Sequence, residues 1–349
     1  PAGSSSVRRL NPGLLLWTLA LLLPLATLLS LATGTVTMTW STLWQALADL
    51  FDDGDLSNQA AMIIFNIRLP RSLLALCVGA ILATSGAVMQ GLFRNPLADP
   101  SLIGVSSGAS AGASLVIVFA ANGMAFGSTL GLTVLGLGAF AGGFAATVLV
   151  YRLATTSSGT SVATMLLAGI AIGALAGALN SLLSYFSDND MLRQISLWQM
   201  GSLSTANWPK ALLIGAVTVP LMILFPRDSR VLNAFLLGES EARYLGIDVQ
   251  RVKRRLILLT AFGVGMSVAI AGLVAFVGLV VPHLVRLLIG PDHRWLIPGA
   301  ALGGAILLLV ADNLARTLTS PAELPTGILT ALLGAPFFVA LLVQQRQRF

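Results

Sequence analysis

Few residues in this chain could do chemistry, and their types and spacing do not form a catalytic group. The 349 residues contain two histidines, His283 and His293, and one cysteine, Cys77, which lies inside an apolar run. A zinc-protease HExxH motif is missing. A phosphate-binding loop needs a lysine after a glycine-rich turn, and the two lysines, Lys210 and Lys253, lack that context. The sequence therefore predicts a chain that is not an enzyme, holds no metal and contains no ATP site.

One carboxylate lies near the end of an apolar run and next to an arginine. Asp312 precedes Arg316 by four residues, so both side chains would project from one helix face and could form a local ion pair. A secondary transporter usually binds its coupling proton or sodium ion at an Asp, Glu or His inside a span. Because Asp312 is the nearest candidate, the sequence favours another transport mechanism and keeps ion coupling as an alternative.

The composition identifies the elements that must position these residues. The chain is 56% hydrophobic and 10% charged, with 35 glycines and a mean hydropathy of +0.88, which is typical of a polytopic membrane protein. Apolar runs of about 20 residues fit helices that cross a bilayer core of about 30 Å better than barrel strands. The predicted fold class is all-α, a membrane helical bundle of about ten transmembrane helices over residues 14–32, 71–91, 101–121, 128–152, 161–186, 208–226, 255–273, 274–290, 296–318 and 326–344. The first run could also be a signal peptide, but the many runs that follow favour a retained helix.

An even number of spans puts both termini on one side of the membrane. If that side is the cytoplasm, it holds fifteen of the 20 Lys and Arg residues, as the positive-inside rule requires. The sequence therefore predicts an N-in, C-in topology, and this topology accounts for the pI near 10.4 better than nucleic-acid binding does. The outer side then holds only Arg68, Arg71, Arg193, Lys210 and Arg316.

Three of these outer arginines are candidates for recognition. Arg68 and Arg71 flank Pro70 just before a predicted span, and Arg316 ends another span. They could be anchors that reach the membrane interface. They could also receive carboxylates of an external protein, a role that suits the planar guanidinium group.

Two segments on the predicted cytoplasmic side interrupt the apolar runs. The proline-broken joint 92–106 can exist at the membrane only where protein buries it or where it lines an aqueous path, and Pro96 and Pro100 are predicted to stop its flanking helices. The polar insert 227–255 has apolar residues at helical spacing and then a glycine. It predicts two short helices that form a docking platform, with a plain loop as the alternative.

Glycines at intervals of four residues predict close helix packing in three of the spans. Small residues at this spacing let helix backbones approach each other inside a membrane. The glycines concerned are Gly104, Gly108 and Gly112, then Gly138 and Gly142, and then Gly169, Gly173 and Gly177.

Many ordered motifs together resemble the permease subunit of type II ATP-binding-cassette (ABC) importers, the iron-siderophore, heme and cobalamin class. The matching segments are Arg68–Arg71, Ser85–Gln90, Asn95–Pro100, Gly104–Ser106, Leu167–Gly169, Gly201–Leu203, Glu241–Gly246, Gly278–Arg286, Ala311–Asp312, Glu323–Gly327 and Gly334–Phe337. The resemblance implies one transmembrane permease domain over residues 1–349, with cytoplasmic coupling helices at about 228–250. It also implies a homodimer in a bacterial inner membrane.

The resemblance implies partners as well. Two cytoplasmic ATPase subunits would carry the ATP and magnesium, a periplasmic binding protein would deliver the substrate, and this chain would bind no cofactor. By motif, the residues that salt-bridge to the binding protein would be Arg68, Arg71 and Arg316. The coupling residues would be Glu239, Glu241, Ala242, Leu245 and Gly246. The cytoplasmic gate would contain Asn95, Leu97 and Ser161, the last in a turn rich in Ser and Thr at 155–161.

The cargo is predicted from one short region after the fifth span. Leu192, Arg193, Trp198 and Trp208 resemble the heme-importing branch more than the siderophore branches. Arg193 could bind a heme propionate bidentately, or it could pair with a neighbouring aspartate. Heme is therefore the favoured cargo, with ferric siderophores and cobalamin as alternatives.

Overall fold

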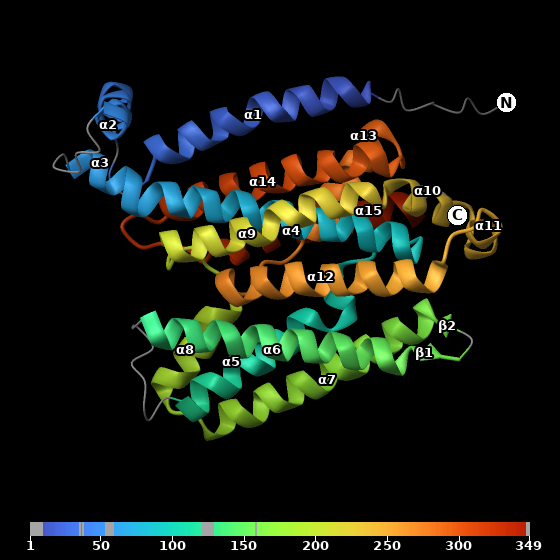
Figure 1. Cartoon of the computed structure of the whole chain (residues 1–349). Helices are drawn as coiled ribbons and strands as arrows, with labels where there is room; N and C mark the ends of the chain where they lie inside the picture. Colours follow the sequence, from blue (N-terminus) through green and yellow to red (C-terminus); the bar gives the residue numbers. More distant parts are fainter. Residues whose placement is uncertain are drawn as a thin grey trace.

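The computed structural model describes residues 10–34, 36, 38–52, 59–120, 129–157 and 159–346. Its helices lie roughly parallel in one bundle (Figure 1). Arg8, Arg9 and Arg348, which the topology prediction counts as cytoplasmic, lie outside these residues.

Long apolar helices dominate the described part of the chain, and seven helical stretches there are long and apolar enough to cross a membrane. These contain α1 (Pro12–Ala32), α4 (Leu69–Phe93), α6 (Thr129–Leu153), α7 (Val162–Phe186), α9 (Trp208–Arg227), α12 (Val249–Ala271) and α14 (His293–Thr317). Three more apolar helices are α5 (Val105–Ala120), α13 (Val277–Ile289) and α15 (Thr326–Arg346). Together they confirm the predicted all-α membrane bundle of about ten transmembrane helices.

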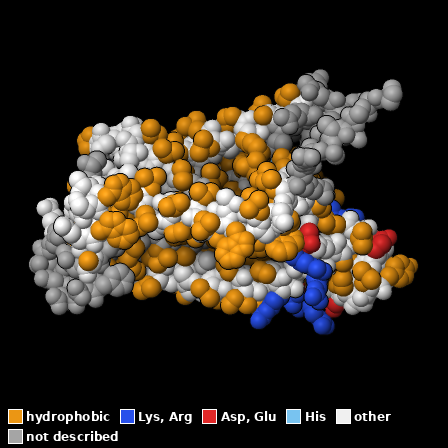
Figure 2. All heavy atoms as spheres, turned by 90° about the horizontal axis from the view of Figure 1, so that it is seen from above, with side chains coloured by type: hydrophobic (Ala, Val, Ile, Leu, Met, Phe, Trp, Pro, Cys, Tyr) orange, Lys and Arg blue, Asp and Glu red, His pale blue; other side chains and the backbone are white. Residues whose placement is uncertain are grey.

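Both ends of the helical bundle have a distinct set of short elements. Helix α1 begins and α15 ends at the same end, together with β1 (Thr155–Thr156), β2 (Gly159–Thr160), α10 (Ser229–Leu237) and α11 (Glu239–Tyr244), as Figure 1 shows. We call this the inner end. The outer end carries α2 (Trp40–Asp52), α3 (Gln59–Ile63) and α8 (Asn189–Gln199). Charged side chains gather near the inner end, and the rest of the visible face is largely apolar (Figure 2).

Glycines bring several helix backbones into direct contact. A methyl group placed on Gly108 of α5 would lie 2.4 Å from the carbonyl oxygen of Gly142 in α6. Likewise, a methyl group on Gly79 of α4 would lie 2.2 Å from the carbonyl oxygen of Gly304 in α14. The packing prediction is wrong for Gly177 within this chain, because no atom lies within 4 Å of that position.

The second predicted span starts earlier than the sequence indicates. Helix α3 continues through a π-helical segment, Ile64–Arg68, into α4, which makes one stretch of 35 residues. Arg68 and Arg71 are therefore helical residues within this stretch and do not precede it. Pro70 is tolerated because it lies near the start of α4, where the preceding π-turn already interrupts the regular hydrogen bonds.

In the joint between α4 and α5, helix α4 ends before the first proline, Pro96. Helix α4 stops at Phe93, and Arg94 follows in the left-handed conformation with φ of 50°. Pro100 then begins a short 3-10 helix, Pro100–Ile103, whose N-cap is Asp99. The prediction that Pro100 stops a helix is therefore wrong.

The same joint folds back into the bundle and does not stay at the surface of the inner end. A methyl group on Gly278 would lie 3.3 Å from Asp99 Oδ2 and 2.9 Å from the carbonyl oxygen of Leu82. Leu82 and Gly278 both lie about 16 Å from the inner ends of their helices at 1.5 Å per residue. Asp99 therefore lies about halfway through a core of about 30 Å, beside a cavity of about 310 Å³.

Candidate functional site

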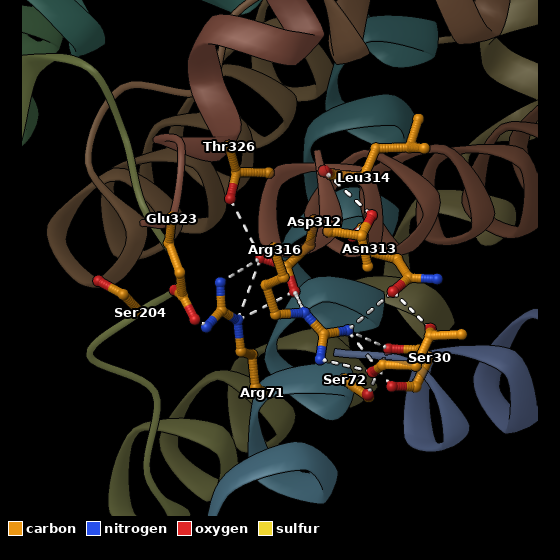
Figure 3. Close-up of polar contacts among 12 residues, drawn as sticks. Ser30, Arg71, Ser72, Ser204, Asp312, Asn313, Leu314, Arg316, Glu323 and Thr326 are labelled. Atoms are coloured by element: carbon orange, nitrogen blue, oxygen red, sulfur yellow. Dashed lines mark hydrogen bonds and ion pairs between the residues drawn. The ribbon is translucent and has the colours of Figure 1, made fainter. Parts of the chain in front are cut away.

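Four charged residues from three parts of the chain meet at the outer end, and we call Arg71, Asp312, Arg316 and Glu323 the outer cluster (Figure 3). Arg71 of α4 donates from Nε and Nη2 to both oxygens of Asp312 in α14, at 3.0 to 3.2 Å. Its Nη1 donates to Glu323 Oε2 at 2.8 Å, in the loop before α15. Arg71 is 5% exposed and Asp312 is 0% exposed, so this bidentate ion pair is almost completely shielded from water.

Arg316 joins the same carboxylate to a further helix. Its Nε lies 3.2 Å from Asp312 Oδ2, which confirms the predicted local ion pair. Its Nη2 donates to Ser30 Oγ in α1 at 2.8 Å. Thr326 adds a hydroxyl donor to Asp312 Oδ1 at 3.1 Å, from the start of α15. A single buried aspartate thereby connects α4, α14 and α15, and through Arg316 also α1.

Arg68 lies beside the outer cluster without a carboxylate partner in the described residues. Its guanidinium donates to the carbonyl oxygens of Leu31 and Val36. A small cavity of about 120 Å³ is lined by all three arginines and by Glu323. Three guanidinium groups face two carboxylates, so this region has a formal excess of one positive charge.

The two short helices of the insert form the inner platform, which we define as residues 229–246. Ala242 is buried against the bundle, whereas Glu241 and Gly246 are exposed. Tyr244 is 91% exposed and Leu245 is 66% exposed. Large apolar side chains at this polar end are unusual unless another surface covers them. Glu239 differs from the others, because its carboxylate pairs with Lys253 of α12.

The predicted gate residues make local hydrogen bonds. Asn95 Oδ1 accepts from the backbone N–H of Leu97 at 2.9 Å. Ser161 is the N-cap of α7, and its Oγ accepts from the backbone N–H of Thr164 at 3.2 Å. Each residue therefore stabilises its own turn, one at the end of α4 and the other after the β1–β2 hairpin.

A larger cavity of about 510 Å³ opens at the outer end. Its lining includes Gln194, Trp198, Lys210 and Glu323, so the outer cluster borders it. Helix α8 supplies Gln194 and Trp198 to this lining, and Arg193 on the same helix is exposed. Among the described residues, no ion pair joins Arg193 to Asp188 or Asp190, the alternative that the sequence left open.

The sequence is similar over most of its length to proteins of a known family. Residues 22–344 match the FecCD transport family. The chain belongs to this family. The hemin transport system permease protein HmuU of Yersinia pestis is 48% identical to it over 342 residues, which cover 97% of this chain and 98% of that protein. The vitamin B12 import system permease protein BtuC of Salmonella arizonae is 43% identical over 329 residues, or 94% of each protein.

A solved structure agrees with this assignment. It is described as an inward-facing conformation of a metal-chelate type ABC transporter, and it superimposes with a TM-score of 0.82 and 37% identity over 96% of this chain and 100% of that one. The chain is therefore the multi-pass permease subunit of a type II ABC importer. Such a subunit translocates its substrate, while a partner subunit hydrolyses ATP and a binding protein supplies the cargo.

Sequence patterns found some of the permease's charged contacts and missed others. The three outer arginines do lie together, and their side chains are buried. The partners Glu323, Ser30 and Thr326 were missed, since nothing in the local sequence relates them to Arg71 or Arg316. Lys253 was also missed, because it lies among Arg251, Arg254 and Arg255 in the sequence, and nothing in this basic run distinguishes the one buried cation from its exposed neighbours.

Proposed function

We propose that this permease carries hemin from the periplasm to the cytoplasm by alternating access. The observation that carries the proposal is the 48% identity to a hemin permease over nearly the full length of both chains. Vitamin B12 permeases at 43–44% identity make cobalamin the second candidate. The outer cavity beside Trp198 supports a large, flat and mostly apolar cargo, because an indole ring can stack on it.

We further propose the assembly in which this import takes place. Two copies of the permease form a homodimer in the bacterial inner membrane, with the path between them. Helix α7 supports this arrangement, because Leu167, Ile170 and Leu175 are exposed and Gly177 leaves room for another backbone. Two ATPase subunits hold the ATP and magnesium, and the permease itself binds no cofactor and no nucleic acid.

In this proposal, Arg68, Arg71 and Arg316 receive carboxylates of the periplasmic binding protein. The excess positive charge beside the 120 Å³ cavity supports this role. Because Asp312 and Glu323 already hold Arg71, docking requires an exchange of ion-pair partners. Glu323 is the partner that can leave, since its side chain is 32% exposed whereas that of Asp312 is fully buried.

At the inner end, the platform docks the ATPase through Glu239, Glu241, Ala242, Leu245 and Gly246. The exposed Tyr244 and Leu245 support this role, because burial by a partner would remove their apolar surface from water. Asn95, Leu97 and Ser161 then form the gate that opens to the cytoplasm.

Reconstitution tests the cargo assignment. Vesicles containing the permease, its ATPase and its binding protein should take up hemin only when ATP is present inside the compartment that holds the ATPase. Cyanocobalamin and a ferric hydroxamate are tested as alternative substrates. If one of them is transported and hemin is not, the assignment of hemin as the cargo is wrong. A Soret band from the purified binding protein after exposure to hemin gives an independent readout. Uptake that needs no ATP and collapses with an ionophore would contradict ATP-driven import altogether.

A further inference from the structure

Lys253 is buried at the inner end, where most cations of the chain are hydrated. It lies in the first turns of α12, and its side chain is 2% exposed. Its Nζ lies 2.6 Å from Glu239 Oε1. The same ammonium group donates to the carbonyl oxygen of Thr160 at 3.0 Å. We call Lys253, Glu239 and Thr160 the inner link.

The inner link joins two elements that do not follow each other in the chain. Glu239 is the first residue of α11 in the inner platform, and Thr160 lies in strand β2. One lysine therefore contacts both the platform and the β1–β2 hairpin. The hairpin in turn leads directly into α7, through the N-cap Ser161.

A second contact fixes the hairpin to α12. Gln250, one helical turn before Lys253, accepts a hydrogen bond from the Thr160 backbone N–H through Oε1 at 3.0 Å. Both polar backbone groups of Thr160 are thus held by α12. The fit is close, because a methyl group on Gly159 would lie 2.4 Å from Gln250 Nε2. A displacement of this turn of α12 must therefore displace the hairpin.

Stability alone does not explain why a lysine is buried here. Removing an ammonium group from water costs several kcal/mol, and an apolar side chain of similar volume is often equally stabilising. An ammonium group offers three donors around one point, so it can hold a carboxylate and a carbonyl oxygen simultaneously. An apolar side chain would fill the space but would leave the two elements unconnected.

We propose that Lys253 is a positioning residue that transmits movement of α11 to the β1–β2 hairpin and the start of α7. The inference rests on the proposed function in one respect, namely that the ATPase moves the inner platform. When α11 shifts, Glu239 pulls Lys253, and Lys253 pulls the Thr160 carbonyl. The gate residue Ser161 follows, because it is the next residue in the chain.

A cysteine placed in the hairpin reports its movement. Ser157 is exposed, and Cys77, the single cysteine in the sequence, is buried, so S157C gives each permease chain one reactive thiol. The probe is a charged maleimide applied to the purified complex of permease and ATPase, with and without ATP and vanadate. With Lys253 present, the labelling rate should change at least about threefold on nucleotide addition.

The test variant is K253M in the S157C background. Methionine keeps an unbranched stem, and Glu239 is 28% exposed, so its carboxylate can remain hydrated without its partner. The nucleotide-dependent change in labelling should fall below about 1.5-fold while ATP hydrolysis stays within about twofold. A K253M complex that keeps the full labelling change would overturn the proposal. Should K253M not assemble, K253L gives the same comparison, since it also lacks both the charge and the hydrogen-bond donors.

Two further variants separate the inner link from its surroundings. R251M removes an exposed ion pair with Asp248 from the same helix turn, and it should keep the full labelling change. The exchange E239K with K253E restores the attraction but removes the donor to Thr160. In preparations where co-purification shows that the ATPase remains bound, this variant should remain unresponsive. Full recovery in the exchanged variant would overturn the role of the Thr160 contact.

The outcome also distinguishes this inference from the proposed function. No labelling response with native Lys253 would refute the inference, because the hairpin would then have no movement to receive. ATP-driven uptake by the same preparation in vesicles would leave the importer assignment intact. If neither the labelling response nor ATP-driven uptake is observed, both the inference and the proposed function are contradicted.

Discussion

The outer cluster and the inner link bury charge at opposite ends of the same bundle, but they do so in different ways. In the outer cluster, two arginines share Asp312, which has no exposed surface. In the inner link, one lysine pairs with Glu239, which remains partly exposed. The first centres on a carboxylate that water does not reach, with Glu323 as its partly exposed edge, and the second pairs a buried ammonium group with a carboxylate that is partly hydrated.

This difference predicts how each region responds to change. Removing a member of a buried network leaves another charge without a partner or water, which is costly. Removing Lys253 leaves only a carboxylate that water can reach. The outer cluster should therefore control stability, while the inner link should control how movement is transmitted.

The largest effect is expected from D312A. This variant leaves Arg71 and Arg316 buried without their shared carboxylate, so the permease should lose about 3–5 kcal/mol of stability. Thermal unfolding in detergent measures the loss. R251A is the matched control, since it removes only the exposed ion pair of Arg251 with Asp248 and should cost less than about 1 kcal/mol. Equal unfolding temperatures for the two variants would contradict the proposal that the outer cluster controls stability.

The next effect is expected from E241R at the inner platform. Glu241 is exposed, and within the described part of the chain its carboxylate accepts a hydrogen bond only from the neighbouring Ser240 hydroxyl, so the substitution should leave the unfolding temperature unchanged. If the platform docks the ATPase, a reversed charge there should lower uptake about tenfold, or about 1.4 kcal/mol. E241Q should lose much less, because it keeps the size of the side chain. Normal uptake by E241R would remove this residue from the docking surface.

The smallest effect is expected from E323Q. The amide weakens one contact of Arg71 while Asp312 still holds the guanidinium, so the permease should stay folded. Because Arg71 then has one competitor fewer, the binding protein should bind about fivefold more tightly, a gain of about 1 kcal/mol that declines with added salt. D190N, on the exposed face of α8, should leave the affinity unchanged. Weaker docking of E323Q would mean that Glu323 orients Arg71 and does not compete for it.

Hydropathy and residue spacing predict the helices well and the long-range contacts poorly. The apolar runs, the two short platform helices and the ion pair of Asp312 with Arg316 follow from local periodicity, because each depends on residues a few positions apart. Arg71 and Glu323 are 252 positions apart, so no local pattern relates them. The fold-back of Asp99 depends on space left by Gly278, which belongs to a distant helix.

The backbone contact of Gly79 with Gly304 packs α4 closely against α14, so we expect the two helices to tilt together. Helix α4 has 25 residues and is therefore about 37 Å long. One tip carries Arg71 and the other carries the joint after Phe93. A tilt of about 5° at the outer tip would sweep the inner tip through roughly 3 Å, about the width of a water molecule. Such a displacement requires no bending of the helix and no change in its internal hydrogen bonds.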